Sequence, residues 1–303
     1  MGWVRLGATE KQFPGGSRMR ATMFFLLLLI NLSASGQQVT QDPSLGRVSH
    51  QGIGPHCLSN AELPTGSTED AITATFSIVA VDPQTGVCGA AVASKYPAVG
   101  KVVPYVRAGV GAFCTQHHHV PRWGEQALDL LAAGKRPEAV LLELLEQDPA
   151  AEMRQLAIID LQGRAAVHNP TQAPARSRYW GAITGRYYCC QGNTLGGRRV
   201  ITEMARAYET TKGSLTDRLM AALVAGDCAG GDHRGRLAAG IRVAKKGIAG
   251  DWFSLYVDKS DDAVVDLFKR YVHAKHPAKG KWAAAQPPFQ HPCPRRGVSP
   301  PVR

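Results

Sequence analysis

Two apolar segments separated by a short turn constrain the fold more than any other feature of the chain. Residues 75–82 read TFSIVAVD and residues 87–94 read VCGAAVAS, and the PQTG sequence between them is a turn signal. Together they predict a β-hairpin. Both strands are apolar on both of their faces, so we expect the sheet that contains them to be covered on both sides.

The rest of the central region alternates between strand and helix patterns. Further strands are expected at residues 102–107, 109–115, 155–160, 165–168, 187–191, 237–245 and 252–258. Helices are expected at residues 125–133, 137–146, 200–211, 215–225 and 263–274. Pro137 suits the first position of a helix, and Ser214 with Asp217 forms a capping box. Strands in groups and helices in pairs predict an α/β (α+β) domain, an α/β/β/α sandwich, at residues 75–275.

The positive charge of the chain is confined to its two ends. Residues 1–36 carry a net charge of +3 and residues 267–303 a net charge of +8, so the total of +11 leaves residues 37–266 neutral. A neutral folded part argues against a nucleic-acid-binding function, which needs a basic face on the fold. Residues 276–303 are rich in Pro and Lys, and we expect a disordered basic tail there.

The N-terminal region has the pattern of a signal peptide. The apolar run FFLLLLI at residues 24–30 follows Arg18 and Arg20 and precedes the small residues SASG at 33–36. The run is short for a membrane span, although a signal anchor remains the alternative. We therefore expect a signal peptide region at 1–36, a pro-segment or linker at 37–74, and a secreted protein without membrane attachment after cleavage near Gly36.

Cysteine and histidine spacing gives no clear metal site. The seven cysteines match no zinc pattern and are too few for a disulfide scaffold, although one or two disulfides remain open. His117 and His119 would share a face of an extended segment, and His233 could join them as a zinc ligand. No acidic or cysteine partner is placed by spacing. We therefore interpret the histidine run as a solvated loop and expect neither a metal nor a cofactor.

Several blocks of the central region resemble a known family. They are ATFSIVAVDPQTGVCGAAVASKYPAVG (74–100), VVPYVRAGVGAFCTQ (102–116), PRWG (121–124), RQLAIIDLQGR (154–164), QGNTL (191–195) and GGDHRG (230–235). They resemble the domain-of-unknown-function family 1028 (DUF1028), which is placed in the N-terminal-nucleophile (Ntn) hydrolase superfamily. The resemblance implies a four-layer αββα fold and no established substrate. The chain departs from the family in having 74 residues before Thr75, and in Arg236-Leu237, where the family usually has Gln-Ser.

The resemblance implies a nucleophile at Thr75. In Ntn hydrolases the residue that becomes the N-terminus attacks an amide carbonyl with its hydroxyl or thiol, and its own α-amine is the general base. An α-amine has a pKa of about 8, so it can accept a proton near neutrality. The alternative is that Thr75 only starts a β-strand, a position that threonine favours.

The other candidate site residues lie at the ends of predicted strands. Ser94 follows the second hairpin strand, and Lys101 could lower the pKa of a nearby nucleophile, unless it is a surface lysine. Backbone or side-chain N–H groups of Thr115-Gln116 and Gly192-Asn193 could bind an oxyanion, unless these residues serve only turn geometry. Asp232 and Arg234 could form a polar pair, unless they form a structural turn.

These residues lead to one main hypothesis and two alternatives. The main one is a secreted amide-bond hydrolase that acts on a small-molecule or peptide amide after residues 1–74 are removed. The first alternative is a non-catalytic ligand- or cell-wall-binding module with the same fold, and the second is a partner-binding structural protein. Homo-oligomer formation is left open. The main hypothesis predicts that Thr75, Ser94, Lys101, Gly192, Asn193 and Asp232 converge around one cleft.

Overall fold

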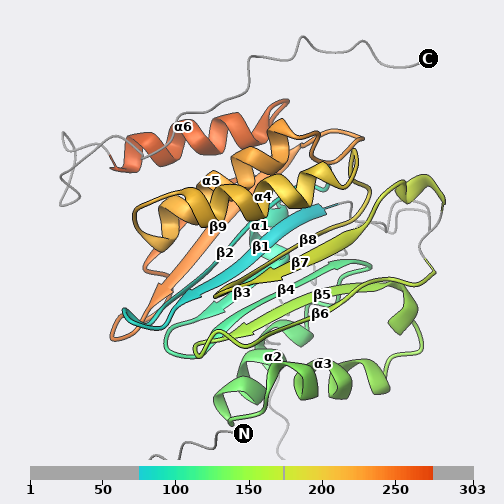
Figure 1. Ribbon diagram of the computed structural model, residues 1–303, viewed down its shortest axis with the longest axis vertical. Coiled ribbons are helices and arrows are strands. Elements are labelled where there is room, and N and C mark those ends of the chain that lie inside the picture. Colours follow the sequence, from blue (N-terminus) through green and yellow to red (C-terminus); the bar gives the residue numbers. More distant parts are fainter. Residues whose placement is uncertain (1–74, 173–174, 276–303) are drawn as a thin grey trace, which may run out of the picture. The chain divides into compact units, whose positions relative to one another are not determined.

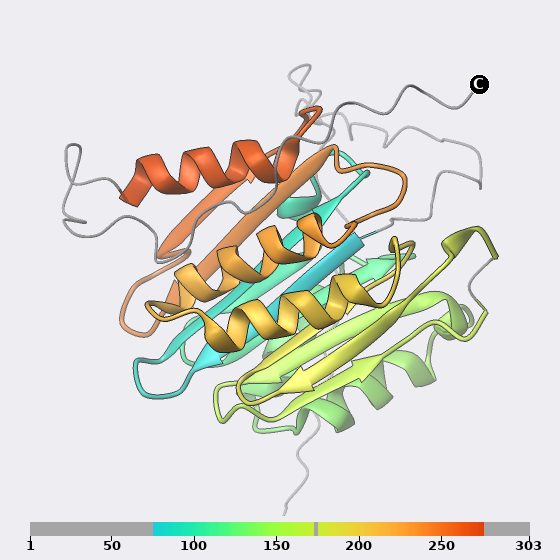
Figure 2. The same ribbon diagram turned by 45° about the horizontal axis from the view of Figure 1, so that its top comes forward.

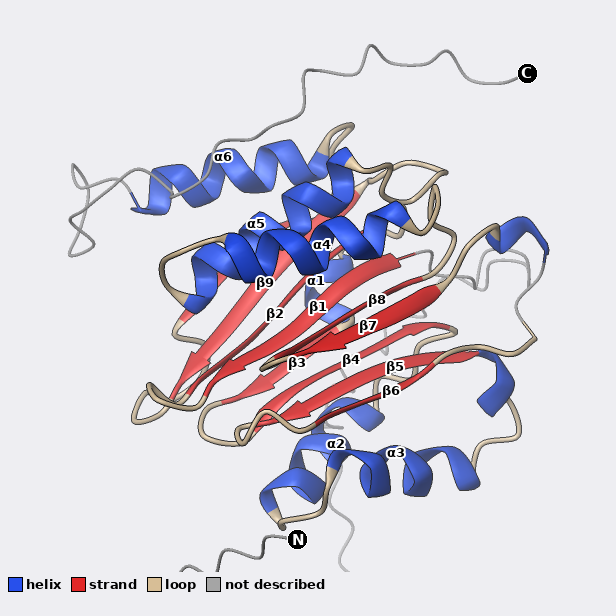
Figure 3. Cartoon of the chain, viewed as in Figure 1, coloured by secondary structure: helices blue, strands red, loops and turns tan. Residues whose placement is uncertain are grey.

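The computed structural model describes residues 75–172 and 175–275 of the chain. These residues form a mixed α/β structure with two antiparallel sheets and six α-helices (Figure 1; strands are red in Figure 3). The expected signal peptide region, pro-segment and basic tail lie outside the described residues.

The larger sheet has six strands in the order β10-β9-β2-β1-β8-β7. Their bounds are β1 (Thr75–Asp82), β2 (Val87–Ser94), β7 (Gly181–Gly185), β8 (Tyr188–Gly192), β9 (Ala238–Lys245) and β10 (Phe253–Val257). The smaller sheet has four strands in the order β3-β4-β5-β6. Their bounds are β3 (Pro104–Arg107), β4 (Gly111–His117), β5 (Arg154–Asp160) and β6 (Ala165–His168).

Helices cover the outer face of each sheet, and the two inner faces pack on one another. The helices are α1 (Val99–Val102), α2 (Trp123–Ala132), α3 (Pro137–Glu146), α4 (Arg199–Thr210), α5 (Leu215–Cys228) and α6 (Ala263–Lys275). Helices α4, α5 and α6 lie over the larger sheet, as Figure 2 shows, and α2 and α3 lie over the smaller sheet. Separate apolar clusters fill the space under each helix layer and the space between the sheets.

The predicted hairpin is confirmed, with β1 and β2 paired along their whole length from Thr75–Ser94 to Asp82–Val87. Phe76 and Ile78 on β1 pack under the helices, whereas Val79 packs between the sheets. The prediction that this sheet is covered on both faces is therefore also confirmed. Burying each large apolar side chain of this kind stabilises the fold by about 1.5–3 kcal/mol.

The capping box at the start of α5 is present as expected. The backbone N–H of Asp217 donates to the Ser214 hydroxyl at 3.3 Å, and the Asp217 carboxylate accepts from the Ser214 backbone N–H at 2.8 Å. The same carboxylate also accepts from Lys275 and Tyr271 of α6. The start of α5 is therefore fastened to the C-terminal end of α6.

Two segments differ from the sequence prediction. The expected strand at 102–107 begins only at Pro104, because Val99–Val102 forms the short helix α1. That helix packs directly on β9, where a Cβ on Gly100 would lie 2.7 Å from the Cα of Gly240. The close backbone contact therefore requires glycine at position 100. The second difference is the edge strand β7, which the sequence analysis missed.

Cysteines in the described residues are mostly buried thiols. Cys88, Cys114, Cys189 and Cys190 are free, and Cys228 is disulfide-bonded. Cys189 and Cys190 point to opposite faces of β8, Cys189 into the cluster between the sheets and Cys190 into the cluster under the helices, as expected for adjacent residues of a strand.

Candidate functional site

Thr75 and Ser94 face each other at one end of the larger sheet. They are cross-strand partners in the β1–β2 hairpin, and the Thr75 hydroxyl donates to the Ser94 hydroxyl at 3.4 Å. Because side chains alternate along a strand, Thr75 lies on the same face as Val79, which packs between the sheets. Both hydroxyls are fully buried, and Ser94 also accepts from the backbone N–H of Tyr96 at 2.9 Å. The candidate nucleophile therefore lies at the edge of the intersheet layer.

The carbonyl of Thr75 is held by one donor that follows β8 and by one on β4. The backbone N–H of Asn193 donates to it at 2.9 Å, and the side-chain amide of Gln116 lies 3.4 Å from the same oxygen. Gly192, the last residue of β8, is the cross-strand partner of Phe76. Three of the predicted oxyanion and binding residues are thus brought beside Thr75, where the Asn193 N–H and the Gln116 amide bind its main chain.

Asp232 and Arg234 form both a polar pair and a turn. The Asp232 carboxylate accepts from the backbone N–H of Arg234 at 2.9 Å and lies 3.5 Å from its Nε, while Gly235 N–H donates to the Asp232 carbonyl. The carboxylate also accepts from the backbone N–H of Lys95 at 3.2 Å, directly after Ser94. Burial raises the pKa of Asp232, and the nearby Arg234 and these hydrogen bonds oppose that shift.

Two predicted residues have contacts of their own outside this group. The Nζ of Lys101 lies 2.5 Å from the Asp258 carboxylate in an exposed ion pair and 5.7 Å from the centre of the Tyr256 ring. These contacts match the surface-lysine interpretation. The Thr115 hydroxyl accepts from the backbone N–H of Val120 at 3.0 Å, so it fixes the loop after β4.

The solvated-loop interpretation of the histidine run is wrong for His117. Its side chain is fully buried at the end of β4, and Nδ1 lies 2.6 Å from the carbonyl oxygen of Met153. Burial lowers its pKa to about 4. His119 packs instead on the ring of Tyr96, with 6.1 Å between the ring centres. Within residues 75–172 and 175–275 no three histidine, cysteine or acidic side chains form a group suited to a metal ion.

Gln155 of β5 belongs to the residues around Thr75, but the sequence pattern does not identify it as a site residue. Its carbonyl oxygen accepts from the side chains of both Gln116 and Asn193, at 2.7 and 2.9 Å. The sequence pattern identifies position 155 only as the start of a predicted strand. The signal for it is a glutamine at the first inward position of a strand whose next inward residues, Ala157 and Ile159, are apolar.

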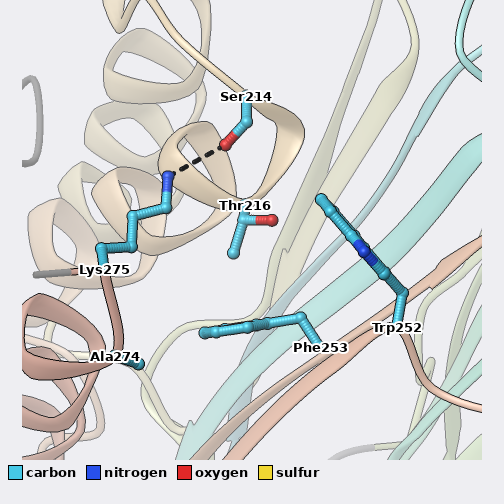
Figure 4. Close-up of a pocket in the computed structure, with 6 residues that line it drawn as sticks. All are labelled: Ser214, Thr216, Trp252, Phe253, Ala274 and Lys275. Carbon is cyan, nitrogen blue, oxygen red and sulfur yellow. Dashed lines mark hydrogen bonds between the residues drawn. The ribbon is translucent and has the colours of Figure 1, made fainter. Parts of the chain in front are cut away.

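A cavity of about 180 Å³ lies away from this group, between α5, α6 and the start of β10 (Figure 4). Its lining residues are Ser214, Thr216, Trp252, Phe253, Ala274 and Lys275. Phe253 pairs with Val243, and Val243 pairs with Gly89, which lies five residues along β2 from Ser94. At 3.3 Å per residue, that is about 17 Å of strand. The cavity is therefore separate from the Thr75 site.

The groups around Thr75 suit acyl transfer. The Thr75 hydroxyl lies beside the Ser94 hydroxyl, with amide donors nearby, and the buried Asp232 carboxylate accepts from the backbone N–H that follows Ser94. Hydroxyl attack on a carbonyl needs a base for the proton and donors for the resulting oxyanion.

None of the helices in the described ranges is both long and apolar enough to cross a membrane.

Comparisons with known proteins identify relatives of this chain. A family model described as "Family of unknown function (DUF1028)" matches residues 75–267. Among solved structures, the chain is similar to the crystal structure of protein SPO2555 from Silicibacter pomeroyi, which carries the same family model. The two are 30% identical with a TM-score of 0.62, and the match covers 69% of this chain and 88% of that chain. A comparison with curated proteins gives no match.

Proposed function

Because the chain belongs to the DUF1028 family, whose function is unknown, we propose an activity from the geometry of its own site. The proposed activity is that of a secreted amide-bond hydrolase of the Ntn type, with Thr75 as the nucleophile. The packing of two sheets between helix layers supports an assignment to the four-layer αββα class of Ntn hydrolases. The apolar run at residues 24–30 supports export through a signal peptide.

One observation carries the proposal. Thr75 opens the central strand β1, with its hydroxyl on the hydroxyl of Ser94 and its carbonyl fixed by Asn193 and Gln116. A threonine that merely started a strand would need no buried polar side chains from other strands around it. Their presence is expected where the main chain of a nucleophile must be oriented.

The proposed reaction needs cleavage of the Ala74–Thr75 bond. In the uncleaved chain the Thr75 nitrogen is an amide and is not basic, so the chain should be inactive. After cleavage the free α-amine takes the proton of the Thr75 hydroxyl as the oxygen attacks the substrate carbonyl carbon. The C–N bond of the substrate then breaks, and the leaving amine receives that proton. Water hydrolyses the resulting ester and restores the hydroxyl. Attack of Thr75 on the Ala74 carbonyl or an external protease would serve equally for the initial cleavage.

A specific observation favours the second candidate, a non-catalytic binding module with the same fold. The Thr75 side chain is fully buried, and the side-chain amide of Asn193 donates to Gln155. In this arrangement the Asn193 amide is engaged inside the protein, whereas an oxyanion donor must point towards substrate.

The two candidates are separated by labelling with a β-lactone, which acylates an activated hydroxyl by ring opening and adds its whole mass. The hydrolase predicts one adduct on Thr75 of the secreted, processed wild-type chain. It also predicts an adduct in the Thr75→Ser variant, which keeps a hydroxyl, and none in Thr75→Ala. Equal labelling of wild type and Thr75→Ala would remove Thr75 from the chemistry and favour the binding module.

A further inference from the structure

We propose that Gln116 and Gln155 are positioning residues that hold the Thr75 main chain in place from the opposite sheet. The inference rests on the proposed function. It extends that function to one residue on β4 and one on β5, both strands of the smaller sheet. They belong to a buried group that we call the amide cluster: Gln116, Gln155, Gln191 and Asn193.

The amide cluster occupies one end of the intersheet layer only. On β1 the inward side chain nearest Thr75 is Ser77, followed by Val79 and Val81. Strands β4, β5 and β8 repeat this order, with one polar inward residue followed by small or apolar ones. These are Gln116 then Cys114 and Ala112 on β4, Gln155 then Ala157 and Ile159 on β5, and Gln191 then Cys189 on β8. Polar side chains are therefore placed where the strands approach Thr75, whereas the rest of the layer is apolar or small.

The hydrogen bonds of the cluster run across the gap between the sheets. The Ser77 hydroxyl donates to the Gln116 carbonyl oxygen at 2.7 Å, and the Gln116 amide donates to the Gln155 carbonyl oxygen at 2.7 Å. The Gln155 amide then donates to the carbonyl of Gly192 and to Asn169, each at 2.9 Å. The oxygen of the Gln155 side chain thus accepts hydrogen bonds, and its nitrogen donates them. The side chain of Gln155 therefore has one orientation that satisfies all of its partners.

The chain of bonds ends on the Thr75 carbonyl. Asn193 holds that carbonyl with its backbone N–H, and Gln155 holds Asn193 through its side chain. Gln116 reaches the same carbonyl directly at 3.4 Å. A fixed carbonyl fixes the peptide plane after Thr75, which restricts the directions open to its hydroxyl and nitrogen. Since a misplacement of about 1 Å can slow an enzyme on the order of a hundredfold, such restraint has catalytic value.

The test uses the processed wild-type chain and three variants. Gln155→Leu removes every bond of that side chain at similar size. Leu156→Ala is the matched control, because Leu156 is the next residue of β5 but packs on the opposite face, under α2 and α3. Gln155→Glu tests rescue, because a protonated carboxyl keeps one donor and one acceptor, whereas the ionised form has no donor for Gly192. It also serves if Gln155→Leu fails to fold.

Two quantities are measured for each folded variant. The first is the rate of β-lactone acylation at Thr75, and the second is the rate of hydrogen exchange at the Asn193 backbone N–H. We expect Gln155→Leu to be acylated about tenfold more slowly or worse, with faster exchange at Asn193. Leu156→Ala should match wild type in both quantities while melting at a lower temperature. Gln155→Glu should approach the wild-type rate as the pH is lowered.

The outcomes separate this inference from the proposed function. Equal acylation and exchange rates in Gln155→Leu, Leu156→Ala and wild type would overturn the positioning role. So would a Gln155→Glu variant whose rate relative to wild type does not change with pH. If wild-type Thr75 is not acylated at all, the proposed function fails, and exchange at Asn193 still decides whether Gln155 holds the Thr75 carbonyl.

Discussion

The buried ring of His117 should make the stability of this protein depend on pH. Its Nδ1 contacts the carbonyl of Met153, and its pKa is lowered to about 4, first by burial and then by the charges of His118, Arg234 and Arg154. The hydrogen bond to Met153 opposes this shift. In the unfolded chain the pKa returns to about 6.5. Between these values the unfolded state binds more protons, so the free energy of unfolding falls as the pH falls from 6.5 to 4.

The size of the effect follows from the two pKa values. Lowering the pH from 7.5 to 5 should cost about 2 kcal/mol of stability through this one ring. The His117→Asn variant isolates it, because Asn has no proton to gain and tolerates the left-handed backbone at this position, where φ is 65°. Urea unfolding gives the free energy of unfolding of wild type and variant at both pH values. Groups that titrate elsewhere contribute equally to both proteins, so the difference between them reports on His117. If both proteins lost the same stability on acidification, the reasoning from burial would be refuted.

Three further predictions concern packing, capping and the tail. Gly111→Ala should destabilise the domain by about 1–3 kcal/mol in urea unfolding, since the new Cβ would lie 2.1 Å from the carbonyl of Ile159. Gly196→Ala, whose Cβ meets only ordinary contacts, should cost much less. Ser214→Ala should lose about 1 kcal/mol, measured in the same way, because the cap of α5 is removed. Truncation after Lys275 should leave the melting temperature unchanged when it is compared with the full chain under reducing conditions, which open the Cys228 disulfide in both. A drop of several degrees would show that the following residues are docked on the domain.

The elements that could be predicted from sequence are those with a strong local pattern. The β1–β2 hairpin combines two uniformly apolar strands with a clear turn, and Ser214 with Asp217 has the spacing of a capping box. Both features depend on residues close together in the chain. The edge strand β7 has the sequence GAITG, in which glycines at both ends hide the strand pattern, and it becomes a strand through pairing with β8.

The candidate site could be predicted only in part, because its contacts span long sequence separations. Thr75 and Ser94 are neighbours through the hairpin, so their contact follows from local structure. The bonds of Gln155 to Asn193 and Gln116 join strands of different sheets, and no local pattern predicts how two sheets align. The same reason explains why the sequence does not predict the partner of Lys101. Its ion pair with Asp258 forms only when α1 packs beside β9 and β10.

The intact mass of the mature protein shows whether Thr75 ever becomes the N-terminal residue. We expect a wild-type chain that begins at Thr75, with a free α-amine. Thr75→Ala should retain the preceding residues if the chain cleaves itself, and both proteins should begin at position 75 if an external protease acts. A stable wild-type chain that retains residues 37–74 would contradict the proposed mechanism, because an amide nitrogen at Thr75 cannot serve as the base.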